Sequence, residues 1–258
     1  MTITFLHLSD LHLVPPGRLL AGIDPARRMQ GVKARIEQLD FSPAFVVVSG
    51  DLTDDGSTES YDVVKGVLQD LRGENKDTPV LLALGNHDDR ATFRRVILGE
   101  EGGDQGPCHY SQVIDGLRVI VLDSSVPGEV GGALGASQLA WLEDQLQKPA
   151  PRGNLIVIHH PCRLAGPAHH YPMFILRDAD DLEAIVGRHR DRVVGILAGH
   201  SHQLNSAPFG GTVHVTAPAV LYQLDYFAGA QFTPVPGSGF NLCQLDDDGL
   251  IVHPVLLR

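Results

Sequence analysis

The feature that most constrains this chain is a set of short apolar segments separated by amphipathic stretches. The segments are rich in Val, Ile and Leu and are short, as expected for strands covered on both faces. They comprise residues 3–8, 45–48, 80–84, 119–122, 155–158 and 193–198. Between them, apolar residues recur at spacings of three and four, the period of a helix with one buried face. Strands that alternate with helices predict a layered α/β fold.

Four helices are expected in the amphipathic stretches. Asp24 is a capping residue followed by Pro25 at the first helical position, so this pair starts the first helix. The others are expected from Ser57 to Gly73, from Ser137 to Pro149, and from Asp178 onward. The last 50 residues have no helical pattern and contain predicted strands at 212–216, 240–245 and 250–257. We therefore expect the fold to end in an antiparallel β portion packed against the α/β part.

Five of the predicted strands are followed by a cluster of Asp, Asn or His residues. The clusters are Asp10-Leu11-His12, Gly50-Asp51, Gly85-Asn86-His87-Asp88, His159-His160-Pro161 and Gly199-His200-Ser201-His202. The carboxyl ends of strands in an α/β sheet share one edge, and ligands bind at that edge. The five clusters should therefore converge in space, although they are spread over about 190 residues of sequence.

Each cluster taken alone also has an ordinary interpretation. Asp-x-His occurs as a loop salt bridge, Gly-Asp as a turn, Asn-His-Asp as an Asx turn with a helix cap, and His-His-Pro in solvated loops. His200 and His202 are a sharper signal, because one intervening residue lets both imidazoles point into one cleft. All five clusters at one predicted edge favour a common site over five unrelated turns.

The residue types in these clusters indicate a metal centre. Zinc takes three or four protein ligands, so seven candidates suffice for two ions if one carboxylate bridges them. Carboxylate, imidazole and amide donors without a thiolate favour Fe, Mn or Zn over Cu(I) or an iron–sulfur cluster. Two such ions can activate water and bind phosphoryl oxygens during an in-line displacement. The candidate metal ligands are Asp10, His12, Asp51, Asn86, His159, His200 and His202.

Composition and charge exclude several classes of protein. With 31 acidic and 20 basic residues the net charge is −11, which argues against duplex nucleic acid as a partner. No apolar run approaches the roughly 18–20 residues of a membrane-spanning helix, and the start of the chain does not resemble a signal peptide. Cys108, Cys162 and Cys243 are scattered and are interpreted as reduced thiols. A cytoplasmic protein without a membrane segment is expected.

The five clusters carry a family resemblance. Their order and spacing over residues 10–202 resemble the signature of the calcineurin-like dinuclear metallophosphoesterases. The longer strings at 9–12, 50–54, 85–90, 114–128 and 137–142 are similar to those of class III cyclic-nucleotide phosphodiesterases. The resemblance is weakest in 163–177 and 218–238, and bacterial glycerophosphodiesterases share much of the pattern.

The resemblance implies a role for each residue. One ion would take Asp10, His12, Asp51 and His202, and the other would take Asp51, Asn86, His159 and His200, with Asp51 as the bridge. His87 would not bind metal but would protonate the leaving alkoxide as a general acid, with Asp88 orienting it. His159 is preferred to His160 because the family's histidine stands two residues before the proline. The implied substrate contacts are His12, Asp51, Asn86, His87 and His202.

The resemblance also implies a fold and an activity. The fold is a four-layer αββα sandwich of two mixed β-sheets flanked by helices, in a single domain over residues 1–258. The activity is hydrolysis of a phosphodiester by a hydroxide activated at the dinuclear centre. The leading substrate is a 3′,5′-cyclic nucleotide, cAMP or cGMP, converted to the 5′-nucleotide. The alternatives are a glycerophosphodiesterase or broad-specificity phosphodiesterase, and a non-catalytic cyclic-nucleotide-binding module. Family members are commonly oligomeric, so a homodimer or larger assembly is expected.

Several other residues stay open at the level of sequence. His160 is either a loop histidine or a contact of the site. His169-His170-Tyr171 form either a pocket wall or a surface loop. Residues 218–258 comprise an aromatic segment followed by the last strands, and that segment is a lid, a subunit interface or a local packing cluster. His7 is expected in the core. The acidic charge does not exclude a small phosphodiester, because two divalent ions beside Asp10 and Asp51 leave a locally positive centre.

Overall fold

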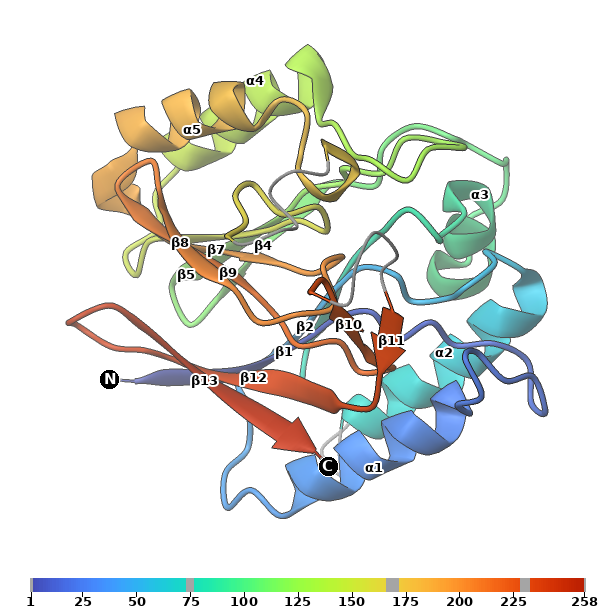
Figure 1. The fold of residues 1–258 in the computed structure, drawn as a ribbon. Coiled ribbons are helices and arrows are strands. Elements are labelled where there is room, and N and C mark those ends of the chain that lie inside the picture. The colour runs from blue at the N-terminus through green and yellow to red at the C-terminus, as the bar shows by residue number, and fades with distance from the viewer. Residues whose placement is uncertain (1, 73–76, 166–171, 228–232, 258) are drawn as a thin grey trace.

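Two large β-sheets stacked against each other form the centre of the structure (Figure 1). The computed structural model describes residues 2–72, 77–165, 172–227 and 233–257. The first sheet has the strand order β13-β12-β1-β2-β3, and the second has the order β4-β5-β6-β7-β9-β8. In the first sheet the strands are β1 (Ile3–Leu8), β2 (Val46–Ser49), β3 (Val80–Ala83), β12 (Ser238–Leu245) and β13 (Leu250–Leu257). In the second they are β4 (Tyr110–Ile114), β5 (Leu117–Val121), β6 (Asn154–Val157), β7 (Val193–Ala198), β8 (Ser206–Phe209) and β9 (Thr212–Thr216). A small ribbon pairs β10 (Gln223–Asp225) with β11 (Thr233–Val235).

Helices cover the outer face of each sheet (Figure 1). The long helices α1 (Pro25–Glu37) and α2 (Thr58–Leu71) pack on the first sheet, while α4 (Gly135–Gln147) and α5 (Ala179–Arg188) pack on the second. The remaining helical elements are short: α3 (Arg90–Phe93) and the turns at Arg94–Leu98, Pro172–Phe174 and Arg190–Arg192. This order of layers confirms the expected αββα sandwich of two mixed sheets.

The helix ends follow from their capping residues. The carboxylate of Asp24 accepts hydrogen bonds from the amides of Ala26 (3.0 Å) and Arg27 (3.2 Å), as predicted for an N-cap. Asp178 immediately precedes α5, as predicted, but its side chain does not cap that helix. Although α5 begins directly after it, its carboxylate accepts from the amide of Gly135 (2.7 Å), at the start of α4. Asp178 therefore joins the two helices on the second sheet, and α4 begins two residues before the predicted Ser137.

Apolar side chains fill the space between the sheets. Phe5 stacks on Phe45 with ring centroids 4.4 Å apart, and both are fully buried with Val119 and Leu155 from the opposite sheet. In the first sheet, β1, β2 and β3 run parallel. In the second, β5, β6, β7 and β9 run parallel. Burial on both faces explains why these strands are continuous apolar runs.

The C-terminal strands agree with the prediction in part: β12 and β13 form the expected antiparallel pair, but the placement of the three strands differs. They do not form a separate antiparallel portion, because they are divided between the two sheets. β12 pairs antiparallel with β1, from Ile3 opposite Leu245 to His7 opposite Asn241, and thus extends the first sheet. β9 lies parallel to β7 in the second sheet. Apolar residues of β12 complete the core between the sheets, which the strand pattern alone does not reveal.

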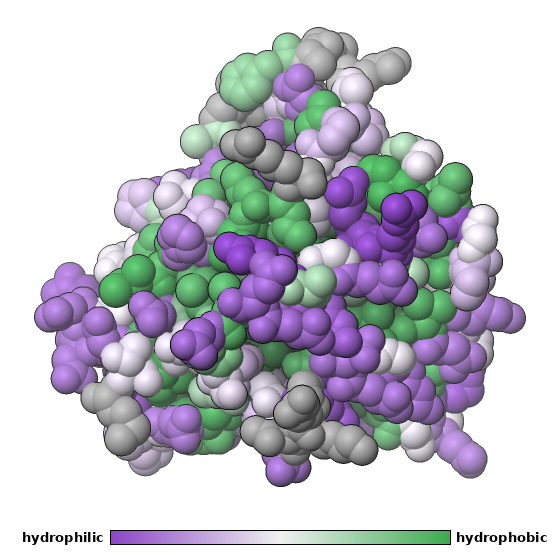
Figure 2. All heavy atoms as spheres, turned by 90° about the horizontal axis from the view of Figure 1, so that it is seen from below, coloured by the Kyte–Doolittle hydropathy of each residue, from purple (hydrophilic) through white to green (hydrophobic). Residues whose placement is uncertain are grey.

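The surface is polar where the helices meet solvent. α1 exposes Arg27, Gln30, Arg35 and Glu37 while burying Met29 and Val32. The face seen from below Figure 1, where α1 lies, carries mainly hydrophilic side chains with hydrophobic areas between them (Figure 2). Within the described ranges, no helix has both the length and the apolar character needed to cross a membrane.

Candidate metal centre

The five polar clusters lie together at the carboxyl ends of β1, β2, β3, β6 and β7. Backbone hydrogen bonds join the loops directly: the amide of Asp10 donates to the Gly50 carbonyl (3.1 Å), and the amide of Gly199 donates to the His159 carbonyl (2.9 Å). The amide of His200 donates to the Asp10 carboxylate (3.0 Å). The structure therefore brings the sequence-predicted residues of both sheets to one edge of the sandwich.

Backbone strain is concentrated in this edge. In the described part of the chain, seven residues other than glycine have positive φ, and five of them are predicted metal ligands. A positive φ in such residues costs of order 1–3 kcal/mol and persists where the surroundings fix it, typically at functional sites. The five, with φ between 44° and 64°, are Asp10, His12, Asp51, His200 and His202.

Two glycines let the loops approach the ligands closely. A Cβ atom on Gly85 would lie 2.2 Å from Oδ1 of Asp51 and 2.7 Å from Nε2 of His159. A Cβ atom on Gly199 would lie 1.8 Å from Oγ of Ser9. A larger residue at either position would therefore displace the loops that carry the candidate ligands.

The first group of ligand atoms contains two histidines and two aspartates. Nε2 of His12 lies 3.1 Å from Nε2 of His202 and 3.5 Å from Oδ2 of Asp51. Nε2 of His202 lies 3.6 Å from Oδ1 of Asp10. All four residues are at least 95 % buried. These atoms form one compact set of donors around a common point.

The second group shares Asp51 with the first. Nε2 of His159 lies 3.3 Å from Oδ2 of Asp51 and 3.3 Å from Oδ1 of Asn86. His200 lies beside His159 with ring centroids 5.0 Å apart. Asp51 contacts both groups through the same carboxylate, which is the arrangement expected of a bridging ligand.

Hydrogen bonds fix which ring nitrogen of each histidine faces the centre. Nδ1–H of His159 donates to the Ser49 carbonyl (2.8 Å), and Nδ1–H of His202 donates to the Tyr222 carbonyl (2.9 Å). Nδ1–H of His12 donates to the Asp54 carboxylate (3.3 Å), while Nε2–H of His200 donates to the Met173 carbonyl (3.0 Å). In each case the other nitrogen keeps its lone pair, which is the usual second contact of a metal-bound imidazole.

The donor set fits metal ions. With both Nδ1 atoms committed as donors, the Nε2 atoms of His12 and His202 face each other as two lone pairs at 3.1 Å, an unfavourable pair without a cation. Two ligands about 2.1 Å from one ion are separated by about 3 Å, close to the observed spacing. Oδ2 of Asp10 is buried without a hydrogen-bond partner in the described structure. The residues present therefore suit two ions that share Asp51.

The electrostatics of the site also favour the binding of cations. Burial disfavours the charged forms of Asp51 and His159, but their mutual attraction prevails. It holds the pKa of Asp51 well below its usual range and raises the pKa of His159 to about 9. Burial likewise lowers the pKa of His12, but Asp54, Asp51 and Asp10 raise it overall. Burial lowers the pKa of both His200 and His202. The buried carboxylates thus favour positive charge at this point, which bound metal ions would supply.

His87 occupies a different position from the ligands. Its side chain is 40 % exposed, and Nδ1–H donates to the backbone carbonyl of Asp54 (2.8 Å). Its ring packs edge-on against His12, with centroids 4.8 Å apart. His87 thus stands at the solvent-facing side of the centre, and its Nε2 has no hydrogen-bond partner among the described residues. This position suits a proton donor better than a buried ligand.

Asp88 does not orient His87, so that expectation is wrong. Its carboxylate accepts hydrogen bonds from the amides of Leu52 (3.1 Å), Thr53 (3.1 Å) and Gly85 (2.9 Å), and from the hydroxyl of Tyr61 (3.0 Å). Burial and the charge of Asp51 raise the pKa of Asp88 to about 6. Asp88 instead joins the loops after β2 and β3, because its side chain turns toward their backbone amides.

The imidazole of His87 is instead held by a hydrogen bond to Asp54, a residue to which the sequence analysis assigned no role. Its carbonyl holds His87, and Oδ1 of its carboxylate accepts from His12. The carboxylate also pairs with Arg18 (3.4 Å). A signal was present, since Asp54 stands three residues after Asp51 in the same loop, but acidic loop residues are usually solvated.

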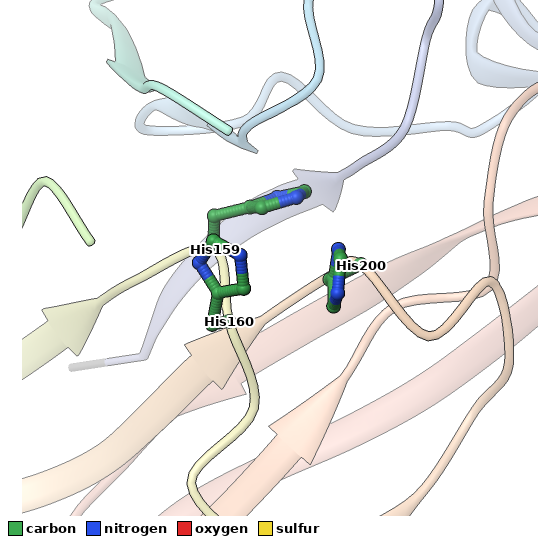
Figure 3. Close-up of side chains that lie close together, drawn as sticks. All are labelled: His159, His160 and His200. Carbon is green, nitrogen blue, oxygen red and sulfur yellow. The ribbon is translucent and has the colours of Figure 1, made fainter. Parts of the chain in front are cut away.

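His160 is a buried structural neighbour of the centre. Its Nε2–H donates to the Val130 carbonyl (2.9 Å), and its Nδ1 accepts from the hydroxyl of Ser124 (2.7 Å). Both nitrogens are therefore committed, whereas Nε2 of His159 is free to face Asp51. Figure 3 shows the two adjacent rings pointing to different sides, with His200 beside them. This geometry favours His159 as the ligand.

The remaining open residues fall into two groups. His7 is fully buried, with Nε2–H donating to the hydroxyl of Ser49 (2.9 Å), as expected for a core histidine. Tyr222 and Tyr226 of the aromatic segment lie against the centre: Tyr222 contacts His202, and the hydroxyl of Tyr226 donates to the Ser201 carbonyl. His169, His170, Tyr171 and Phe232 lie outside the described residues.

Comparisons with known proteins identify the family of this chain. Residues 3–204 match the family model described as calcineurin-like phosphoesterase. A Rhodococcus erythropolis protein named "Probable cyclic nucleotide phosphodiesterase" is 38% identical, over 97% of this chain and 82% of its own. A Mycobacterium tuberculosis protein named cAMP/cGMP dual specificity phosphodiesterase is 35% identical, over 97% and 78%. A glycerophosphodiester phosphodiesterase of Enterobacter lignolyticus is 33% identical, over 85% and 78%.

Solved structures show the same fold. A dimetal phosphatase from Danio rerio superposes with a TM-score of 0.66 at 16% identity, covering 99% of this chain and 98% of the other. The family match includes all five ligand-bearing loops, and two relatives above 30% identity extend it over nearly the whole chain. With its two stacked sheets and its converging carboxylates and imidazoles, the chain belongs to the calcineurin-like phosphoesterase family.

Proposed function

We propose that this protein hydrolyses phosphodiesters at the metal centre, with 3′,5′-cyclic nucleotides as the leading substrate. The observation that carries the proposal is the convergence of the seven candidate ligands, with His87 exposed beside them. A non-catalytic binding module would be expected to lose Asp51, Asn86 or His87, and all three are present.

Each residue has a defined role in this proposal. Asp10, His12, Asp51 and His202 hold one ion, and Asp51, Asn86, His159 and His200 hold the other. Fe, Mn and Zn all suit these donors. When bound, the ions supply positive charge for the phosphoryl oxygens and lower the pKa of water. The chain supplies the proton: Nε2–H of His87 donates to the leaving oxygen, while the Asp54 carbonyl holds Nδ1–H and thereby fixes the ring.

The relatives guide the choice of substrate. Two with the cyclic-nucleotide name are 38% and 35% identical, and they support cAMP or cGMP as substrate. The glycerophosphodiesterase at 33% identity supports a second candidate, a glycerophosphodiester. The structure favours neither, because part of each variable stretch, 163–177 and 218–238, lies outside the described residues.

A substrate panel tests the proposal. We expect kcat/KM to be higher for cAMP or cGMP than for 2′,3′-cyclic nucleotides and glycerophosphodiesters, on protein whose metal content has been measured. Negligible cAMP and cGMP hydrolysis with efficient glycerophosphodiester cleavage would select the second candidate. Metal-loaded protein that cleaves none of these diesters would contradict hydrolysis altogether.

The general-acid role of His87 makes a separate prediction. Replacing it with Gln should leave the metal content near normal, because its side chain lies outside the ligand set. Turnover of diesters with poor leaving groups should fall by a factor of 10² or more, and activated aryl diesters should lose far less. Equal losses on both substrates would remove this assignment.

The wider setting of the enzyme is also proposed. We expect a single domain acting in the cytoplasm on small phosphodiesters, without duplex nucleic acid or membrane partners, and assembled at least as a homodimer. Sedimentation should then give about twice the chain mass of 27.8 kDa. A sedimenting species of one chain mass would contradict the dimer without affecting the proposed chemistry.

A further inference from the structure

Tyr222 lies beside the metal centre, outside the residues 3–204 that match the family model. Its segment follows β9 and is fixed to the first polar cluster by the backbone. The amide of Val220 donates to the Ser9 carbonyl (3.0 Å), and the amide of Leu221 donates to the Asp10 carbonyl (3.2 Å). Two backbone hydrogen bonds therefore fix the segment just before Tyr222 beside Asp10.

The ring of Tyr222 packs along two of the candidate ligands. Its centroid lies 4.9 Å from that of His202 and 6.4 Å from that of His12, and its plane is within 12° of the His12 plane. Its backbone carbonyl accepts Nδ1–H of His202. Both imidazoles belong to the group that would hold one ion, so the phenol lies at that end of the centre.

The hydroxyl of Tyr222 differs from those of the other described tyrosines. Tyr61 donates to the Asp88 carboxylate, Tyr110 bonds the backbone of Leu82, and Tyr226 donates to the Ser201 carbonyl. Among the four tyrosines that the structure describes, Tyr222 alone has a hydroxyl with no hydrogen-bond partner in the described residues. The side chain of Tyr222 is only partly buried, so this hydroxyl is available to a ligand that enters the centre.

We propose that the Tyr222 hydroxyl donates a hydrogen bond to a phosphoryl oxygen of the bound phosphodiester. This inference rests on the proposed function and adds a substrate contact to it. A phenol is protonated at neutral pH and is thus a donor toward an anion. Phosphoryl oxygens approach the ions, and Tyr222 flanks two ligands of one ion. The side chain thereby serves two purposes, with its ring supporting His12 and His202 and its hydroxyl binding substrate.

Tyr222→Phe isolates the hydroxyl, because the ring contacts with both histidines remain. A hydrogen bond to a charged group is worth about 10- to 100-fold in affinity. We expect KM for the best diester of the panel to rise by that factor, with a smaller change in kcat. Inhibition by inorganic phosphate should weaken by the same factor, while metal content and the thermal midpoint stay close to wild type. Tyr110→Phe, which removes a hydroxyl bonded to the Leu82 backbone, is the matched control and should leave KM unchanged.

The outcomes separate this inference from the proposed function. If wild-type protein hydrolyses the diester and Tyr222→Phe retains its KM and phosphate inhibition, the hydroxyl contact is wrong and the function stands. A higher KM with unchanged phosphate inhibition would also contradict the contact to a phosphoryl oxygen. If wild-type protein binds two ions but hydrolyses no diester, the proposed function fails. The dissociation constant of inorganic phosphate, measured by titration calorimetry on the metal-loaded wild type and on the Tyr222→Phe variant, then still tests the contact.

Discussion

Asp54 connects the two histidines with the most different roles at the centre. Its carboxylate accepts from Nδ1–H of His12, a candidate ligand, and its backbone carbonyl accepts from Nδ1–H of His87, the proposed acid. The hydrogen bond from His12, opposed by partial burial and supported by further positive charge, lowers the pKa of Asp54. The residue thus stays ionised and increases the donor strength of the His12 imidazole.

Replacing Asp54 with Asn should weaken the ion held by His12. The amide has no negative charge to support the imidazole, while the backbone contact to His87 is kept. We expect metal affinity or kcat/KM to fall by about 10- to 100-fold, measured by metal titration and by diester hydrolysis.

Asp55→Asn is the matched control for this change. Asp55 lies in the same loop and also pairs with Arg18, but its carboxylate bonds Ser57 and Ser60 at the start of α2. The Asp55→Asn substitution should therefore lower the free energy of unfolding and leave metal affinity unchanged. Similar metal affinities for the Asp54 variant and wild type would contradict the role given to Asp54.

At the scale of elements, the predictions from sequence depend on how deeply each element is buried. Four predicted strands have the same bounds as observed ones, because most are fully buried or have a clear apolar core face. They are 3–8 (β1), 193–198 (β7), 212–216 (β9) and 250–257 (β13). β4 and β8 were not predicted. Both lie at the edges of the second sheet, and their largely exposed residues give no apolar run. The sheet partners of β9 and β12 depend on contacts far apart in sequence.

The loops after the strands require small residues as much as ligands. Gly85→Ala should place its methyl group within 2.2 Å of Oδ1 of Asp51 and displace the bridging carboxylate. We expect loss of at least one bound ion and of most diester hydrolysis, measured on folded protein.

Gly66→Ala provides the contrasting control. Gly66 is exposed on α2, and a methyl group there would meet nothing within 4 Å. The Gly66→Ala substitution should raise the free energy of unfolding by about 1 kcal/mol, because alanine has the higher helix propensity, and should leave metal binding unchanged. A Gly85→Ala protein with two ions and normal turnover would contradict the close approach at this loop.

For the whole molecule, the sequence could predict convergence of the ligands but not the contacts that support them. Convergence follows from a general property of α/β sheets, that strand ends share an edge, and it identified all seven candidate ligands. The partners of Asp88, Asp54 and Tyr222 could not be predicted. They depend on how loops from different strands turn, and no periodicity in the sequence records that.

Buried neutral histidines also make the stability of the whole molecule depend on pH. His214 in β9 is fully buried, its Nε2 accepts from the amide of Cys162 (3.3 Å), and burial, with a smaller effect of Arg163, lowers its pKa to about 4. The other titratable group that interacts with it, His7, has a pKa lowered to about 3 by burial. Both are neutral in the fold, whereas in the unfolded chain they take up protons near pH 6.5.

His214 should therefore lower stability as the pH falls. Its contribution is fully present above about pH 6.5 and decreases by about 3 kcal/mol by pH 4, because the unfolded chain binds the proton more tightly. Denaturant unfolding of metal-free protein should show this loss, and His214→Gln should lose about 3 kcal/mol less than wild type between pH 7 and pH 4. The exposed His253→Gln variant should behave as wild type. Equal pH dependence in all three proteins would show that His214 is not buried as a neutral group.

The central claim is that seven side chains from five loops hold two ions that the chemistry requires. Its most direct test is to remove all metal with a chelator and then titrate Mn²⁺ into the protein, while following hydrolysis of an aryl phosphodiester. We predict no activity without the ion and an increase that reaches its plateau at two ions per chain. Full activity in the chelated protein, or a plateau at one ion per chain, would contradict the account.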